Sequence, residues 1–235
     1  MKISFSTKFA KRSLGILLVV ALGLCLISLA AQLYSLVFSQ NFLPYLLSFN
    51  LEDGIQILDV RLEMSVPNSF SSALLLLCSV MFAGITFEVK STTRRYTLRW
   101  GALAIVFLLL FFDEQLEIHD RLGKLFESLG TSLLFAYAWY VLAGALLTIF
   151  AVAYLQFLFD LPAQTRQLFV AAGTVYILGA LGGDLLEKII GESSGSIWSP
   201  PAIVIGTIEE FLEMTGAILL LYALMRYTSH REEPG

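Results

Sequence analysis

Residues 100–123 read WGALAIVFLLLFFDEQLEIHDRLG. The first thirteen of them, residues 100–112, carry no charge, and residues 113–120 then carry five ionisable side chains. An apolar run of this kind predicts a helix that is buried in a membrane or in a protein core. The acidic residues at its end therefore lie where an apolar helix meets water or a polar site. The composition of the chain indicates whether lipid or protein surrounds the helix.

The composition indicates a membrane protein. The 235 residues are 57% hydrophobic and 14% charged, whereas a soluble domain carries about 25% charged residues. A globular protein of this size has too little interior for so many apolar side chains. We therefore expect much of the surface to contact the lipid bilayer, which is the expected partner of the chain. The net charge of −4 and the lack of a basic aromatic patch argue against a nucleic-acid partner. No phosphate-binding glycine motif occurs in the sequence, so no nucleotide cofactor is expected.

Six apolar stretches are long enough to span a bilayer as helices. They cover residues of about 13–38, 69–89, 98–117, 131–158, 167–189 and 202–225. We therefore predict an all-α, polytopic membrane helix bundle that forms one integral domain over residues 1–235, with an external loop at about 40–68. The first stretch also has features of a signal peptide, but its continuation to Phe38 favours an uncleaved anchor.

The basic residues predict the orientation of the bundle. Eleven of the 15 Lys and Arg residues lie in the segments on one side of the predicted spans, and the other four, Arg61, Arg121, Lys124 and Lys188, lie on the opposite side. The positive-inside rule then places both termini in the cytoplasm. The expected location is the bacterial inner membrane.

Acidic residues in three predicted spans lie at similar depths. Asp113 and Glu114 lie about 22–24 Å from the inner end of the third span, and Asp184 lies about 25 Å from the inner end of the fifth, at about 1.5 Å per residue. The sixth span runs inward, so Glu209 and Glu213 lie about 10–17 Å below the outer surface. We expect these groups to meet in the outer half of the membrane, toward the periplasm.

Two local features affect how the helices can bring these groups together. Gly179 and Gly183 are four residues apart in the fifth span and predict close approach of a neighbouring helix. His119 points away from Glu114 on a continuous helix. It can join the acidic groups only if the helix ends or bends nearby, which Gly123 makes possible.

Carboxylates at membrane depth need a partner, because each costs about 2.5–3.5 kcal/mol on insertion scales. The cations expected nearby are Arg121, Lys124 and Lys188, which are too few for the acidic residues near the span ends. Protons or a divalent cation are the expected remainder. Oxygen ligands with one imidazole favour Mg²⁺, Ca²⁺, Mn²⁺ or iron. Zinc and haem are not expected, because the only other histidine, His230, lies in the C-terminal tail.

The candidate metal ligands are Asp113, Glu114, His119, Asp120, Asp184, Glu209, Glu210 and Glu213. A competing interpretation places charged groups near the span ends in the wet headgroup layer. It applies to Glu117, Asp120, Arg121, Lys124, Glu127, Glu187 and Lys188. It is weaker for the three glutamates of the sixth span, which lie at least one turn inside it.

Three segments resemble a family of uncharacterised bacterial multipass inner-membrane proteins. They are SVPNSFSSALLLL (65–77), FFDEQLEIHDRLG (111–123) and IEEFLEMTGAILLLYALM (208–225). The matching positions are Pro67, Phe70, Ser71, Ser72, Asp113, Glu114, His119, Glu209, Glu210, Glu213, Met214 and Gly216. Asp120 replaces a glutamate of the family pattern, and Glu117 stands where a small polar residue is more usual. The resemblance implies no known activity.

Three functions fit this pattern. The leading hypothesis is divalent-metal binding, in a membrane-embedded enzyme that acts on a lipid-like substrate or in a site that locks the bundle. The second is a proton- or cation-coupled transporter. It requires a polar path inward, for which the inner halves of the spans offer few polar groups. The third is a non-catalytic subunit or scaffold whose acidic groups bind partner membrane helices.

Overall fold

A computed structural model describes residues 5–38, 57–62, 65–89, 94–130 and 137–230. Every regular element within these ranges is a helix. The predicted all-α fold is therefore confirmed for the described part of the chain. Most of the external loop predicted at about 40–68, and the first residues of the span predicted at 131–158, lie outside the described residues.

The helices follow the predicted spans closely. They are α1 (Thr7–Phe38), α3 (Val66–Glu88), α4 (Arg94–Leu116), α5 (Ile118–Ser128), α7 (Ala138–Asp160), α8 (Ala163–Ile177), the π-helical turn η2 (Leu178–Gly183), α9 (Asp184–Ser194) and α10 (Pro200–His230). Helices α8 and α9 join through η2 into one long helix. The short helix α5 was not predicted.

Five helices are long and apolar enough to cross a membrane. These are α1, α3, α4, α7 and the joined helix from α8 to α9. The sixth predicted span lies within α10, which is not among the helices that meet this criterion in the described part of the chain. The fold is therefore compatible with a membrane protein.

Capping residues set where two of these helices begin. The hydroxyl of Ser65 accepts a hydrogen bond from the backbone N–H of Asn68 at 3.1 Å, and Pro67 occupies the first turn of α3. Helix α10 begins at Pro200, followed by a second proline. Proline suits the first turn of a helix because the N–H groups there have no partner within the helix.

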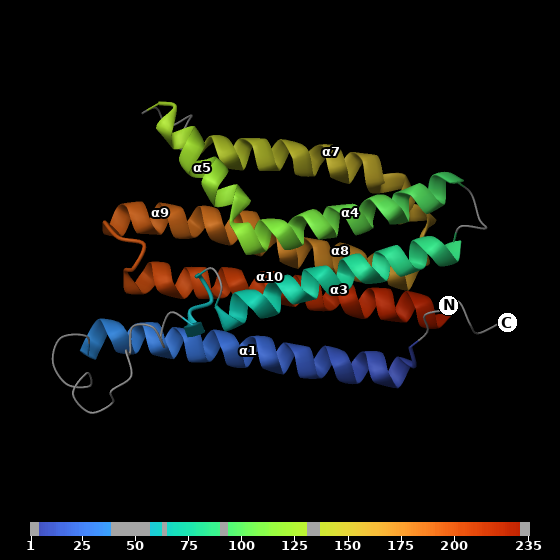
Figure 1. Cartoon of the computed structure of the whole chain (residues 1–235), viewed down its shortest axis with the longest axis horizontal. Coiled ribbons are helices and arrows are strands. Elements are labelled where there is room, and N and C mark those ends of the chain that lie inside the picture. The colour runs from blue at the N-terminus through green and yellow to red at the C-terminus, as the bar shows by residue number, and fades with distance from the viewer. Residues whose placement is uncertain (1–4, 39–56, 63–64, 90–93, 131–136, 231–235) are drawn as a thin grey trace.

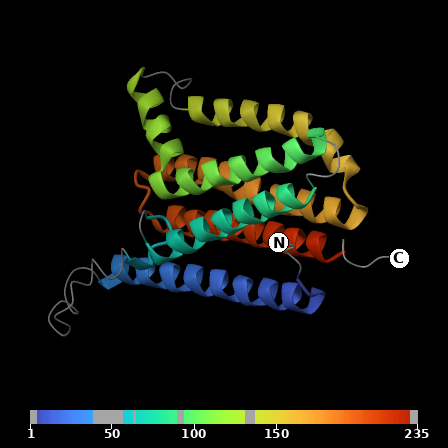
Figure 2. The ribbon, with the colours of Figure 1, turned by 45° about the vertical axis from the view of Figure 1, so that its right-hand side comes forward.

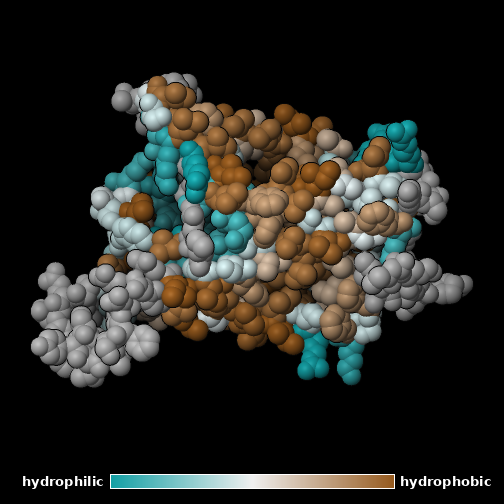
Figure 3. Space-filling view, viewed as in Figure 1, coloured by the Kyte–Doolittle hydropathy of each residue, from teal (hydrophilic) through white to brown (hydrophobic). Residues whose placement is uncertain are grey.

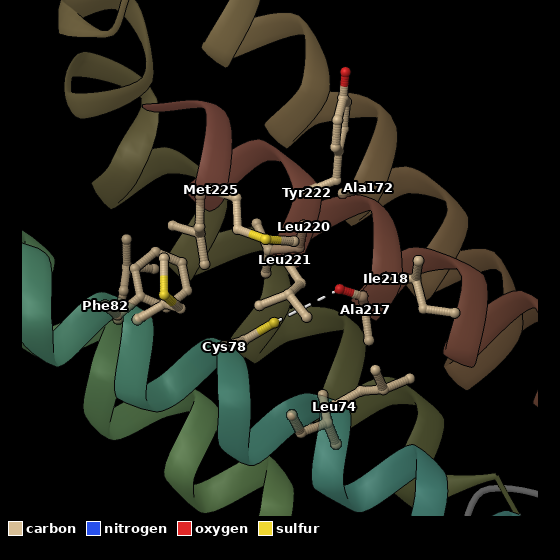
Figure 4. Packing of buried hydrophobic residues seen from close by; sticks show 14 of the residues in the cluster. Leu74, Cys78, Phe82, Ala172, Ala217, Ile218, Leu220, Leu221, Tyr222 and Met225 are labelled. Carbon is tan, nitrogen blue, oxygen red and sulfur yellow. Dashed lines mark hydrogen bonds between the residues drawn. The ribbon is translucent and has the colours of Figure 1, made fainter. Parts of the chain in front are cut away.

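Helix α10 lies at the centre of the bundle. It packs against α1, α3, α8, η2 and α9, while α1 and α7 lie on opposite flanks (Figures 1 and 2). The core between α3 and α10 is formed by apolar side chains such as Leu74, Phe82 and Leu221 (Figure 4). The buried thiol of Cys78 there donates a weak hydrogen bond to the carbonyl of Ala217 at 3.6 Å.

The surface of the bundle is divided into an apolar middle and polar ends. A broad hydrophobic band covers the middle, and hydrophilic residues gather toward both ends (Figure 3). Helix α7 contributes exposed apolar side chains, including Val141, Ile149 and Phe159. The described ends of the chain lie together, because the hydroxyl of Ser229 donates to the carbonyl of Phe5.

The glycine at position 216 allows α8 to pack closely on α10. A Cβ atom added to Gly216 would lie 2.6 Å from the backbone nitrogen of Tyr176. Replacing Gly216 with alanine should therefore lower the free energy of unfolding by about 1–3 kcal/mol, as overpacking does. Gly144 on α7 has nothing within 4 Å of an added Cβ and serves as the control. Thermal denaturation of both variants in detergent measures the difference, and equal melting temperatures would contradict the close packing.

Candidate functional site: an acidic cavity

A cavity of about 550 Å³ lies at the end of the bundle away from Phe5 and Ser229, where hydrophilic side chains gather (Figure 3). Eight carboxylates line this acidic cavity: Glu114, Glu117, Glu127, Asp184, Glu187, Glu192, Glu209 and Glu210. The lining Lys and Arg side chains are Arg61, Lys124 and Lys188. The walls come from residues 60–62 and from α3, α4, α5, α7, α9 and α10, so helices distant in sequence share one site.

The structure brings most of the predicted ligands to this cavity. Five of the eight line it, namely Glu114, His119, Asp184, Glu209 and Glu210. Asp113 and Glu213 are not among the lining residues; Asp113 binds His119, and Glu213 is buried between α10 and η2. Residue 120 belongs to α5, and its side chain lies outside the described part of the structure.

Glycines of η2 position the carboxylates of α10. A Cβ atom added to Gly179 would lie 2.8 Å from the backbone oxygen of Glu209 and 2.8 Å from Cγ of Glu213. One added to Gly183 would lie 2.7 Å from Cβ of Glu209. The close approach expected from this glycine pair therefore occurs, and its neighbour is α10. The π-helical turn that contains both glycines was not predicted; such turns are frequent at functional sites.

Polar residues of α3 hold the C-terminal end of α4. The side-chain amide of Asn68 donates to the carbonyl of Glu114 at 3.0 Å, and the amide of Gln115 donates to the hydroxyl of Ser72 at 2.6 Å. Ser71 of α3 lies near the carboxyl group of Glu114. These contacts fix the backbone of α4 at Glu114 and so place its side chain at the cavity wall.

A break between α4 and α5 turns His119 back toward Asp113. Glu117 separates the two helices in the left-handed conformation, with a φ of 44°. The backbone N–H of His119 then donates to one oxygen of Asp113 at 2.9 Å, and its Nδ1 lies 3.0 Å from the other oxygen. The imidazole also stacks on Trp139. The bend that His119 requires therefore exists, but it occurs at Glu117, whereas Gly123 lies inside α5.

Helix α7 closes one side of the cavity through aromatic hydroxyl groups. The hydroxyl of Tyr140 donates to Asp184 at 3.2 Å, and that of Tyr137 donates to Glu192 at 3.0 Å. The hydrogen bond to Glu192 raises the pKa of Tyr137. Nearby, the ammonium group of Lys188 contacts the carboxylate of Glu127. These contacts tie α7 and α5 to α9.

The sequence analysis missed Arg61 as a member of the site. Its guanidinium group binds Glu187 at 2.7 Å and the carbonyl of Ile197 at 3.1 Å, and it lies 4.6 Å from the ring centre of Trp198. Asp59 lies beside it, and burial raises the pKa of this carboxyl group while Arg61 opposes the shift. Arg61 had been assigned to an external loop, and only the tertiary structure places it in the cavity wall.

The carboxylates that line the cavity outnumber the Lys and Arg side chains there. Within the described residues, no group of three or more His, Cys, Asp or Glu side chains is placed to hold a metal ion directly. The carboxyl groups of Glu187 and Glu209 nevertheless lie close enough to interact with each other electrostatically. Neighbouring carboxyl groups favour the uptake of a proton or a cation. The cavity can therefore exchange protons or bind a cation through several carboxylates.

The pairing of His119 with Asp113 predicts a single imidazole tautomer. With Nδ1–H donating to Asp113, Nε2 carries the lone pair in the neutral ring. Nitrogen-15 NMR should show this tautomer for His119 and an ordinary mixture for His230, the other histidine. Replacing Asp113 with alanine should convert the His119 signal to such a mixture. An unchanged His119 signal in that variant would contradict the role of Asp113.

Comparison with known proteins gives a family for the chain. No curated protein and no solved structure matches it. One family model, described as a domain of unknown function (DUF8692), matches residues 56–228. This range begins just before Arg61 and includes every helix that lines the cavity, and it agrees with the resemblance to an uncharacterised family. The chain therefore belongs to the DUF8692 family.

Proposed function

We propose that this protein is an integral inner-membrane protein that binds a divalent cation in its acidic cavity. The observation that carries the proposal is the charge of the lining, in which eight carboxylates face three Lys or Arg side chains. Arg61 pairs with Glu187 and Lys188 pairs with Glu127, so each of these cations neutralises one carboxylate of the lining. An apolar bundle cannot hold the remaining negative charge without a neutralising partner.

The size of the cavity supports a cation that keeps part of its water shell. A water molecule occupies about 30 Å³ of liquid, so a cavity of about 550 Å³ has room for a hydrated ion. Magnesium in particular usually retains several waters and is held by only one or two carboxylates. Such binding does not require three protein ligands in direct contact with the ion. It therefore fits the arrangement of the described carboxylates.

The proposed orientation places the cavity on the periplasmic side. The described chain ends lie together at the opposite end of the bundle (Figure 1). Arg94, Arg95, Arg99, Arg166 and Arg226 belong to the predicted segments on the side of the termini. The positive-inside rule places that end in the cytoplasm. The cavity would then take up its cation from the periplasm or from the outer leaflet of the inner membrane.

A bound cation would give the site two uses. It could lock the bundle, because Glu114, Asp184 and Glu209 come from three different helices. It could also polarise a water molecule, with a neighbouring carboxylate as general base, toward a lipid-like substrate. Transport through the bundle is less well supported, because the core between α3 and α10 is filled by apolar side chains (Figure 4).

Titration with Mn²⁺, followed by electron paramagnetic resonance on the purified protein, tests cation binding. The native protein should bind about one ion, and the double variant Glu114→Gln, Glu210→Gln should bind it at least about tenfold more weakly. Asp160→Asn is the matched control, because Asp160 pairs with Arg99 at the other end of the bundle. This variant also loses a carboxylate charge but should bind normally.

Two results would contradict the proposal. The first is the absence of Mn²⁺ binding by folded native protein, which would leave protons as the neutralising partner. The second is an equal loss of affinity in the double variant and in Asp160→Asn, which would indicate binding to the general surface charge.

A further inference from the structure

The segment 57–62 fills the outer end of the bundle beside the acidic cavity, and we refer to it as the plug. Val60 and Asp59 are almost completely buried, and Val60, Arg61 and Leu62 line the cavity. Helix α1 holds one side of the plug. The hydroxyl of Ser28 accepts a hydrogen bond from the backbone N–H of Val60, with an N–O distance of 3.0 Å. The side-chain amide of Gln32 donates a hydrogen bond to the carboxylate of Asp59 at 2.8 Å.

Arg61 fastens the other side of the plug to the far wall of the cavity. Its Nη1 atom binds Glu187 of α9 at 2.7 Å, and its Nη2 atom binds Gln32 of α1 at 3.1 Å. The guanidinium plane lies over Trp198, in the turn between α9 and α10. Only 8% of the Arg61 side chain is exposed. One side chain of the plug therefore joins α1, α9 and the start of α10.

A glycine of α10 makes room for the ion pair between Arg61 and Glu187. A Cβ atom added to Gly206 would lie 2.5 Å from Cδ of Arg61 and 2.9 Å from the carboxyl carbon of Glu187. Arg61 and Glu187 thus meet directly over a glycine of α10. Hydrogen bonds to Ser28 and Gln32 hold the plug on α1, whereas its attachment to α9 depends on the ion pair between Arg61 and Glu187. Loss of that pair would release this side of the short segment more easily than any helix of the bundle.

We propose that the plug is a gate of the acidic cavity and that the ion pair between Arg61 and Glu187 is its latch. With the latch closed, the plug separates the cavity from the outer end of α1. With the latch open, water and solutes reach the cavity along that helix. Glu187 also lies beside Glu209, so the latch shares a carboxylate with the acidic groups of the cavity. The proposal concerns access to the cavity and does not depend on which ion occupies it.

The native Cys25 reports on the gate. It lies on α1 three residues before Ser28 and seven before Gln32, so the three side chains share one buried face. It is also close enough to Glu210 to interact with it electrostatically. Cys78 is buried in the apolar core between α3 and α10 and reports on general packing. A hydrophilic maleimide should label neither cysteine in the native protein.

The double variant Arg61→Gln, Glu187→Gln tests the latch. It removes both charges of the pair together, so neither Arg61 nor Glu187 leaves the other as an unpaired buried charge. Asp59, which lies 3.9 Å from Nε of Arg61, keeps its hydrogen bond from Gln32. We expect the rate of maleimide labelling at Cys25 to rise at least tenfold while Cys78 stays protected, as measured by mass spectrometry of the digested protein in detergent. Lys188→Gln is the matched control, because it breaks another ion pair of the cavity and should leave Cys25 protected.

Two outcomes would overturn the proposal. Protection of Cys25 in the double variant, at the native level, would show that the ion pair does not hold the plug closed. Labelling of both cysteines would show that the whole bundle had loosened and that no separate gate exists. The labelling is done without added divalent ions, so failure of the gate and failure of cation binding are distinguished.

Discussion

The packing of α10 against the glycines of η2 is the contact on which the rest of the site depends. Gly179 and Gly183 allow the backbone of one helix to meet Glu209 and Glu213 of the other without a side chain between them. This contact holds carboxylates at the centre of a bundle whose outer surface is apolar. Every other polar feature of the site can be understood as a response to charge in that position.

The polar residues that contact these carboxylates, or that position the helices carrying them, come from several helices around the cavity. Asn68 donates to the backbone carbonyl of Glu114, Tyr140 donates to Asp184, and Arg61 pairs with Glu187. The tyrosine and the arginine are hydrogen-bond donors to carboxylates, which is what buried carboxylates require. The eight carboxylates that line the cavity outnumber its three Lys and Arg side chains, and this imbalance is the physical reason for proposing an exchangeable cation.

The sequence predicted the long helices and the convergence of the acids because both depend on simple periodic properties. Apolar length located the spans, and a rise of about 1.5 Å per residue placed Glu114, Asp184 and Glu209 at one depth. The glycine pair was found because small residues four apart lie on one helix face. These signals are local in the sequence.

The features that were missed depend on tertiary contacts or on single backbone angles. The left-handed conformation of Glu117 breaks a helix at a residue that normally continues one, and no glycine marks the position. Arg61 lies in a short segment without helical periodicity, and its partners are 29 and 126 residues away in the sequence. The contacts of Trp139 with His119 and of Trp198 with Arg61 likewise join residues that are not neighbours on one helix.

The most direct test of the central claim is whether α4 and α10 bring their carboxylates together. Cysteines replacing Glu114 and Glu210, in a chain whose native cysteines are replaced by alanine, should be joined by a short bifunctional thiol reagent. After cleavage between the two positions, a non-reducing gel should show the fragments still linked. A pair at positions 114 and 160 should separate. Separation of the fragments for the first pair would contradict a shared cavity and the function proposed from it.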